Sequence, residues 1–175
     1  MHRLGVFLIF SWLGAMTISC TKQEVTPYQM EQSLNFTISA GLSPSLSHVF
    51  FWNLESPLDS YLKTHGLSLD QVTAVKPADI YIEPVLNSSF SYALINSAKV
   101  TVAPREDLNL FIPIAEEYPL PNIGSGVLHL TGGIADVKSI LKTIENHTEL
   151  VLRFRDIPRS TSNHRLVVRY NVFVK

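Results

Sequence analysis

The chain has 175 residues, a formal net charge of −1 and a single cysteine. A chain this close to neutral has no overall electrostatic attraction to nucleic acid, so we expect no nucleic-acid partner. One cysteine excludes a disulfide-stapled scaffold, and the fold must therefore be held by its hydrophobic core. The length beyond the leader suits one compact domain, which we expect to be monomeric.

The N-terminal segment has the layout of a secretory signal. A short positive start at 1–3 precedes a mostly apolar stretch at 4–16, which is too short to span a bilayer because spanning takes about 20 apolar residues. Cys20 follows the small residue Ser19 and resembles the lipobox of bacterial lipoproteins, although Thr17 stands where leucine is usual. The resemblance implies cleavage before Cys20 and attachment of lipid to its thiol. The alternative is an ordinary signal peptide with a chance cysteine.

This resemblance also sets the expected domain boundaries and location. We expect a signal peptide at 1–19, the lipidated cysteine and a polar tether at 20–33, and a single domain at 34–175. The lipid would hold the protein to the outer membrane of a bacterial cell envelope. Lys22 and Glu24 resemble part of a surface-export signal, so a surface-exposed and a periplasm-facing position both stay open.

Alternating apolar residues predict strands along the domain. Leu34, Phe36 and Ile38 alternate with polar neighbours, which is typical of a half-buried strand, and an aromatic run at 50–52 follows. Ser56 then caps, and Pro57 begins, a short helix that closes at Gly66. Further strands are expected within 72–85, 99–103, 109–115 and 127–131, and Asp136 is a candidate cap for another short helix.

The last forty residues give the clearest pattern. Leu150, Leu152 and Phe154 alternate with polar or mixed residues, and a second alternating run covers 166–174 after a turn at 158–163. We expect these two runs to pair as a hairpin with one face in the core. Many short strands with brief helices predict an all-β fold, an antiparallel β-sandwich of immunoglobulin-like type with one or two short helices in its connections.

Arginines are concentrated in this expected hairpin. If Leu152 and Phe154 point inward, the arginines between them point outward, and the same argument applies to the second strand. The predicted shared face carries Arg153, Arg155, Arg165 and Arg169. It is a candidate site for an anion or an acidic partner, since arginine suits planar bidentate contacts. The alternative is a solvated face whose arginines pair with nearby acids.

The aromatic run is the second candidate site. Three consecutive residues cannot all face one side of a strand, so we expect Phe51 or Trp52 to be available for stacking on a sugar ring or a partner. In the alternative, Phe50 and Trp52 lie in the core and Phe51 rests under a loop.

Catalytic signals are weak. The histidines lack the spacing that places two metal ligands on one helix face, and no cysteine is left for a metal. Glu116 and Glu117 are adjacent and would point to opposite sides of an extended strand, so they do not form a carboxylate pair. We therefore expect no enzymatic activity, no metal and no cofactor.

The order of the segments is similar to a group of lipoproteins of Bacteroidota. The similarity rests on short motifs at 58–63, 69–72 and 96–100 and on the closing hairpin. It implies a lipid-anchored β-sandwich but no functional residue, because that group has no established active site.

Three hypotheses on function follow from the sequence. We favour a binding module for a protein or glycan partner, or a component of an envelope assembly. The alternative is a carrier of a lipid or other apolar ligand held in an enlarged cavity between the sheets. A hydrolase would need a cleft that combines a histidine with an acid such as Glu116 or Asp136.

Overall fold

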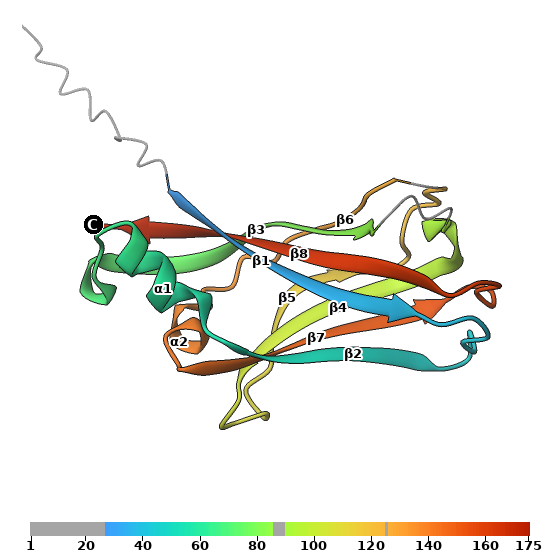
Figure 1. The fold of residues 1–175 in the computed structure, drawn as a ribbon, viewed down its shortest axis with the longest axis horizontal. Helices are drawn as coiled ribbons and strands as arrows, with labels where there is room; N and C mark the ends of the chain where they lie inside the picture. Colours follow the sequence, from blue (N-terminus) through green and yellow to red (C-terminus); the bar gives the residue numbers. More distant parts are fainter. Residues whose placement is uncertain (1–26, 86–89, 125) are drawn as a thin grey trace, which may run out of the picture.

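The computed structural model describes residues 27–85, 90–124 and 126–175. The expected signal peptide and Cys20 lie outside the described residues, as do Lys22 and Glu24. The described strands form two four-stranded antiparallel sheets that pack face to face (Figure 1). The expected all-β antiparallel sandwich is therefore confirmed.

The two sheets have a nested strand order. Sheet A contains, in spatial order, β1 (Tyr28–Ile38), β8 (Ser162–Val174), β3 (Val72–Pro84) and β6 (Leu128–Leu130). Sheet B contains, in spatial order, β2 (Ser47–Glu55), β7 (Glu145–Phe154), β4 (Ile95–Pro104) and β5 (Ile112–Glu117). Strand β1 pairs with β8, β2 with β7, β3 with β6 and β4 with β5.

Every connection except β4 to β5 crosses between the sheets, which is the order of a jelly roll. An immunoglobulin domain instead pairs its first two strands in one sheet, so that finer expectation is corrected.

The expected C-terminal hairpin is also corrected. Strand β7 pairs with β2 and β4 in sheet B, whereas β8 pairs with β1 and β3 in sheet A. Both are central strands: β7 has β2 and β4 as its neighbours, and β8 has β1 and β3, so neither pairs with the other. Alternation along a strand shows which side chains are buried, but it does not identify the neighbouring strand.

The first strand begins earlier than expected. Strand β1 begins at Tyr28, opposite Val172 of β8, and Met30 is buried. The expected tether at 20–33 is therefore too long, because residues 28–33 are part of the sandwich. The polar residues Gln29, Glu31 and Ser33 lie on the outer side of this edge strand, and Gln32 is a polar residue on the inner side, so the stretch has the composition of a linker.

The core lies between the sheets. Its centre is built from aliphatic side chains that are fully buried, including Ile80, Ile82, Val100, Leu150, Leu152, Leu166 and Val168. Removal of this apolar surface from water stabilises the fold by about 25 cal/mol per Å².

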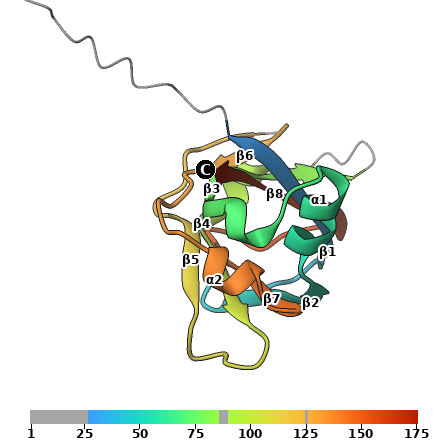
Figure 2. The ribbon, with the colours of Figure 1, turned by 90° about the vertical axis from the view of Figure 1, so that its left-hand side faces the viewer.

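Short helices close one end of the sandwich. Helix α1 (Pro57–Thr64) and helix α2 (Lys138–Leu141) lie side by side at the end where β1 begins and β8 finishes (Figures 1 and 2). As expected, Ser56 caps α1, Pro57 occupies its first turn and Leu58 is buried. Two 3-10 turns complete the connections, at Leu69–Gln71 and Tyr92–Leu94. Within the described ranges, no helix has both the length and the apolarity to cross a membrane.

Candidate functional site

The structure separates the four candidate arginines. Arg165 and Arg169 lie on the outer side of β8 in sheet A, whereas Arg153 lies on the outer side of β7 in sheet B. Arg155 follows the end of β7. The prediction of one shared arginine face is wrong because it depended on β7 and β8 being neighbours.

Arg165 and Arg169 are paired with carboxylates of sheet A. Arg165 Nε donates to Glu83 Oε1 at 2.7 Å, and Arg169 Nε donates to Glu31 Oε2 at 2.8 Å. Arg169 also forms an ion pair with Asp79 at 3.3 Å. Hydrogen bonds to Glu83 and Glu31 raise the pKa of Arg165 and Arg169, respectively, above the ordinary value. These two guanidiniums are therefore neutralised within the protein, as in the alternative interpretation.

Arg155 has a structural contact with two other connections. Its guanidinium donates to the carbonyl oxygen of Ala93 at 3.0 Å and to that of Leu120. Ala93 precedes β4 and Leu120 follows β5, so Arg155 links these two connecting segments to the end of β7.

Arg153 differs from the other three arginines. Among residues 27–85, 90–124 and 126–175, nothing forms a hydrogen bond or ion pair with its guanidinium. It lines a depression of about 340 Å³ on the outer face of sheet B, with Ser97, Ala98, Lys99, Glu116, Glu117, Tyr118 and Val151. Strand register explains this grouping, since Ser97 lies opposite Arg153, and Lys99 lies between Val151 and Glu116. We call this depression the sheet B groove.

The groove has one fixed ion pair and one exposed ring. Lys99 Nζ lies 3.2 Å from Glu116 Oε2, so this lysine is held against the strand beside it. The Tyr118 side chain follows β5 and is 73% exposed. The groove therefore presents an aromatic ring and an unpaired cation to solvent.

Phe51 lies on the same outer face as the groove. It pairs with Glu149 across β2 and β7, is 61% exposed, and stacks on His147 with ring centroids 5.6 Å apart. Trp52 points inward, where it packs against Phe36 and donates from Nε1 to the Asn35 carbonyl oxygen at 3.1 Å. Of the two candidate aromatic contacts, only Phe51 is on an open face.

Sequence reasoning missed His147. Although it is on the outer side of β7, its side chain is almost buried, because Phe51 and Phe111 both contact the imidazole. Its ring nitrogens lie 2.7 Å from Asn53 Oδ1 and 3.0 Å from Glu149 Oε1. These contacts fix the ring on which Phe51 stacks. The alternating pattern places His147 on the outer side of β7, where a side chain is expected to face solvent, so the pattern does not predict that His147 is buried.

One histidine cluster has the outline of a hydrolytic site. His164 Nε2 lies 2.7 Å from Ser162 Oγ, and its Nδ1 lies 3.0 Å from the Tyr92 hydroxyl. Burial lowers the pKa of His164 to about 4 and raises that of Tyr92 far above its usual value. A general base is most effective near the working pH, and a catalytic histidine of this kind is usually oriented by a carboxylate. The neutral Tyr92 phenol and the weakly basic His164 imidazole instead fit a buried hydrogen-bond network that stabilises the fold.

The acids considered for hydrolysis have other contacts. Glu116 binds Lys99, and Asp136 Oδ1 accepts from the backbone N–H groups of Val75 and Lys138, each at 2.9 Å. Asp136 thus ties the segment before α2 to β3. In the part of the chain that the structure describes, no three histidine, cysteine or acidic side chains are grouped to hold a metal ion.

Comparison with known proteins does not assign this chain to a family. No protein family and no curated protein matches the chain. Among solved structures, the crystal structure of the decameric BFDV capsid protein matches with 12% sequence identity and a TM-score of 0.38. The match covers 83% of this chain and 98% of the capsid chain. A match at this level carries no argument about fold or function.

Proposed function

We propose that this chain is a non-catalytic lipoprotein of the bacterial cell envelope, anchored to the outer membrane through Cys20, that binds a glycan on the outer face of sheet B. The observation that carries the proposal is that Arg153, Tyr118 and Phe51 share one face. The first is an unpaired cation, and the other two present exposed rings. A protein partner on the same face is the alternative.

The chemistry of the groove suits an acidic sugar. The apolar C–H faces of a sugar ring pack on aromatic rings such as that of Tyr118, while a carboxylate accepts two parallel hydrogen bonds from a guanidinium such as that of Arg153. The Ser97 hydroxyl offers a further hydrogen bond. The groove volume of about 340 Å³ falls at the lower end of the range for ligand pockets, about 300–1,000 Å³. We therefore expect it to take one or two rings of a longer chain.

Several side chains on this face have contacts within the protein that favour one position. His147 is held on both ring nitrogens, and Phe51 stacks on it. Lys99 is held by Glu116. Groups that are fixed in advance lose less conformational entropy on binding, which supports a preformed recognition surface.

The carrier hypothesis has no specific observation in its favour. The space between the sheets is occupied by one cluster of buried side chains, including Leu128, Leu150 and Tyr170. The exposed rings of Phe51 and Tyr118 lie on the outer side of sheet B and not between the sheets.

Glycan arrays with matched variants test the binding proposal. Arg153→Gln should weaken binding to carboxylate-bearing glycans by about tenfold, equivalent to about 1.4 kcal/mol, and Tyr118→Ala should weaken it by a similar factor. Arg165→Gln is the matched control, because Arg165 is on the outer face of the other sheet and is paired with Glu83. Equal losses for Arg153→Gln and Arg165→Gln would contradict the proposed groove. Absence of glycan binding, with an envelope protein cross-linked at Tyr118, would support the protein alternative.

The anchoring proposal needs a separate measurement. Intact mass of the protein from whole cells should show an acylated Cys20, and Cys20→Ser should release the protein from membranes or leave it uncleaved. Digestion of whole cells with external protease then distinguishes surface display from a periplasm-facing position. Unchanged membrane partition of Cys20→Ser would contradict the lipid anchor.

A further inference from the structure

We propose that the end of the sandwich formed by α1 and α2 rests on the lipid bilayer, with Ile144 and Leu69 inserted among the lipids. This inference rests on the proposed lipid anchor at Cys20. It concerns a different surface from the sheet B groove and assigns an orientation to the whole domain.

The first support is the place where the folded domain begins. Strand β1 begins at Tyr28 at the α1 end of the sandwich (Figure 1). The Tyr28 ring is 5.9 Å from that of His65, which follows α1. An extended chain spans about 3.3–3.6 Å per residue, so the stretch from Cys20 to Tyr28 reaches at most about 29 Å. The 13 residues of β8 span about 43 Å. An anchor at Cys20 therefore keeps the α1–α2 end near the bilayer, while the opposite end can lie well beyond the reach of the tether.

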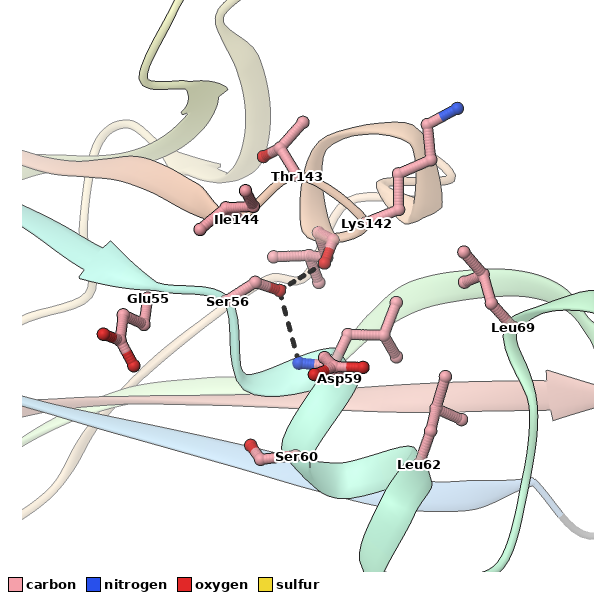
Figure 3. Close-up of a pocket in the computed structure, with 11 residues that line it drawn as sticks. Glu55, Ser56, Asp59, Ser60, Leu62, Leu69, Lys142, Thr143 and Ile144 are labelled. Atoms are coloured by element: carbon pink, nitrogen blue, oxygen red, sulfur yellow. Dashed lines mark hydrogen bonds between the residues drawn. The ribbon is translucent and has the colours of Figure 1, made fainter.

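The second support is a pair of exposed apolar side chains at this end, Leu69 and Ile144, beside a cleft that polar residues such as Glu55, Asp59 and Lys142 also line. Helices α1 and α2 border a cleft of about 400 Å³, whose lining includes the buried residues Leu58, Leu62 and Leu141. Figure 3 shows Leu69 and Ile144 on opposite sides of it. The Ile144 side chain is 84% exposed, and Leu69 is also exposed. Both side chains would leave water if this end met the bilayer, which favours this orientation of the tethered domain.

The third support is the way the cleft is held together. The Ser56 hydroxyl donates to the Leu141 carbonyl oxygen at the end of α2 and accepts from the backbone N–H of Leu58 in α1 at 3.3 Å (Figure 3). One side chain therefore fixes the two helices relative to each other. Lys142 points away from the cleft, as Figure 3 shows, and its ammonium can lie among lipid head groups while Ile144 inserts.

This orientation would leave the sheet B groove free. The groove is built where β4 begins and where β5 and β7 finish, at the end opposite α1 and α2 (Figure 1). A domain that rests on its α1–α2 end would thus present Arg153 and Tyr118 away from the membrane.

Site-specific labelling tests the orientation. Cys20 is the only cysteine of the chain, and acylation would occupy its thiol, so one introduced cysteine can be labelled alone. We would attach an environment-sensitive fluorophore to lipidated Ile144→Cys in vesicles of phosphatidylethanolamine and phosphatidylglycerol. Ile157→Cys is the matched control, because Ile157 is also an exposed isoleucine but follows β7 at the opposite end. Both sites are exposed, so neither substitution should disturb the core, which circular dichroism checks.

The expected result is a blue shift of the emission at position 144 and strong quenching by lipids that carry a quencher on the acyl chain, with neither effect at position 157. Equal quenching at both sites, or stronger quenching at 157, would overturn the orientation. Intact mass separates the two proposals. Acylated protein without quenching at 144 contradicts the orientation alone, whereas protein without acyl chains contradicts both the anchor and the orientation.

Discussion

His164 Nδ1 lies 3.0 Å from the hydroxyl oxygen of Tyr92, and neither side chain is exposed to solvent. The rings of Phe36 and Phe90 also contact the imidazole, so an imidazolium at this position would be formed in an apolar layer. Burial accordingly lowers the pKa of His164 to about 4 from an ordinary value of 6.5.

The lowered pKa predicts acid-dependent stability. Between pH 6.5 and pH 4 the unfolded chain binds a proton at His164 that the folded chain does not, so the free energy of unfolding decreases as the pH falls through this range. The loss from this group should reach roughly 3 kcal/mol near pH 4, because each pKa unit corresponds to about 1.36 kcal/mol. Urea unfolding at pH 7 and pH 4.5 measures it. His164→Gln should show a smaller difference between the two pH values, and an unchanged difference would contradict this account.

Ser56→Ala should weaken the connection between α1 and α2. The substitution removes the cap of α1 and the bond to the Leu141 carbonyl oxygen together, for an expected loss of about 1–2 kcal/mol in the free energy of unfolding. Ser60→Ala is the control, because the exposed Ser60 hydroxyl only donates to Pro57 within the same helix. Chemical denaturation of both variants measures the difference, and similar losses would show that the contact between helices contributes nothing.

Trp52→Phe should lower stability by about 1 kcal/mol. Phenylalanine keeps a ring against Phe36 but removes the Nε1 donor to Asn35, a hydrogen bond that joins the edge strands β2 and β1 of the two sheets. Phe51→Leu, which changes only the outward neighbour, should stay within about 0.5 kcal/mol. Circular dichroism during urea unfolding follows both variants. A loss for Phe51→Leu as large as that for Trp52→Phe would argue against the role of the indole bond.

Engineered disulfides test the strand order directly. Thr37 and Asn163 are register partners on β1 and β8, with their side chains hydrogen-bonded at 2.8 Å, so Thr37→Cys with Asn163→Cys should cross-link under mild oxidation. Arg155→Cys with Arg165→Cys is the control pair, which a β7–β8 hairpin would place close together but the jelly roll places in separate parts of the sandwich. Mass spectrometry before and after reduction identifies the bridge. Efficient cross-linking of the control pair alone would favour the hairpin.

Much of the local structure was predictable from the sequence. The alternation at Leu34, Phe36 and Ile38 placed these side chains inside, as the structure has them. Ser56 followed by Pro57 predicted the beginning of α1, since the cap and the fixed proline φ act within one turn. The run at 50–52 predicted one outward aromatic residue, which is Phe51. The boundary before β1 was less predictable, because polar residues on the outer side of an edge strand resemble a tether.

The candidate site was predictable only in part. Phe51 and Arg153 were each singled out, but in two unrelated clusters, and Arg153 was grouped with arginines that lie on another sheet. Tyr118 and His147 carried no local signal, because their roles depend on residues that are distant in sequence, such as Arg153 and Asn53.

The sequence by itself determined which side of each strand is buried, because a period of two between apolar residues is a local property that water enforces. Only the tertiary structure decided which strands are neighbours. Every residue except proline carries the same backbone N–H and C=O groups, so these groups do not specify which strand pairs with which. The assignment of β7 to sheet B and β8 to sheet A follows from how all eight strands share two sheets around one core. That assignment paired Arg165 and Arg169 with carboxylates and left Arg153 on the open face with Phe51.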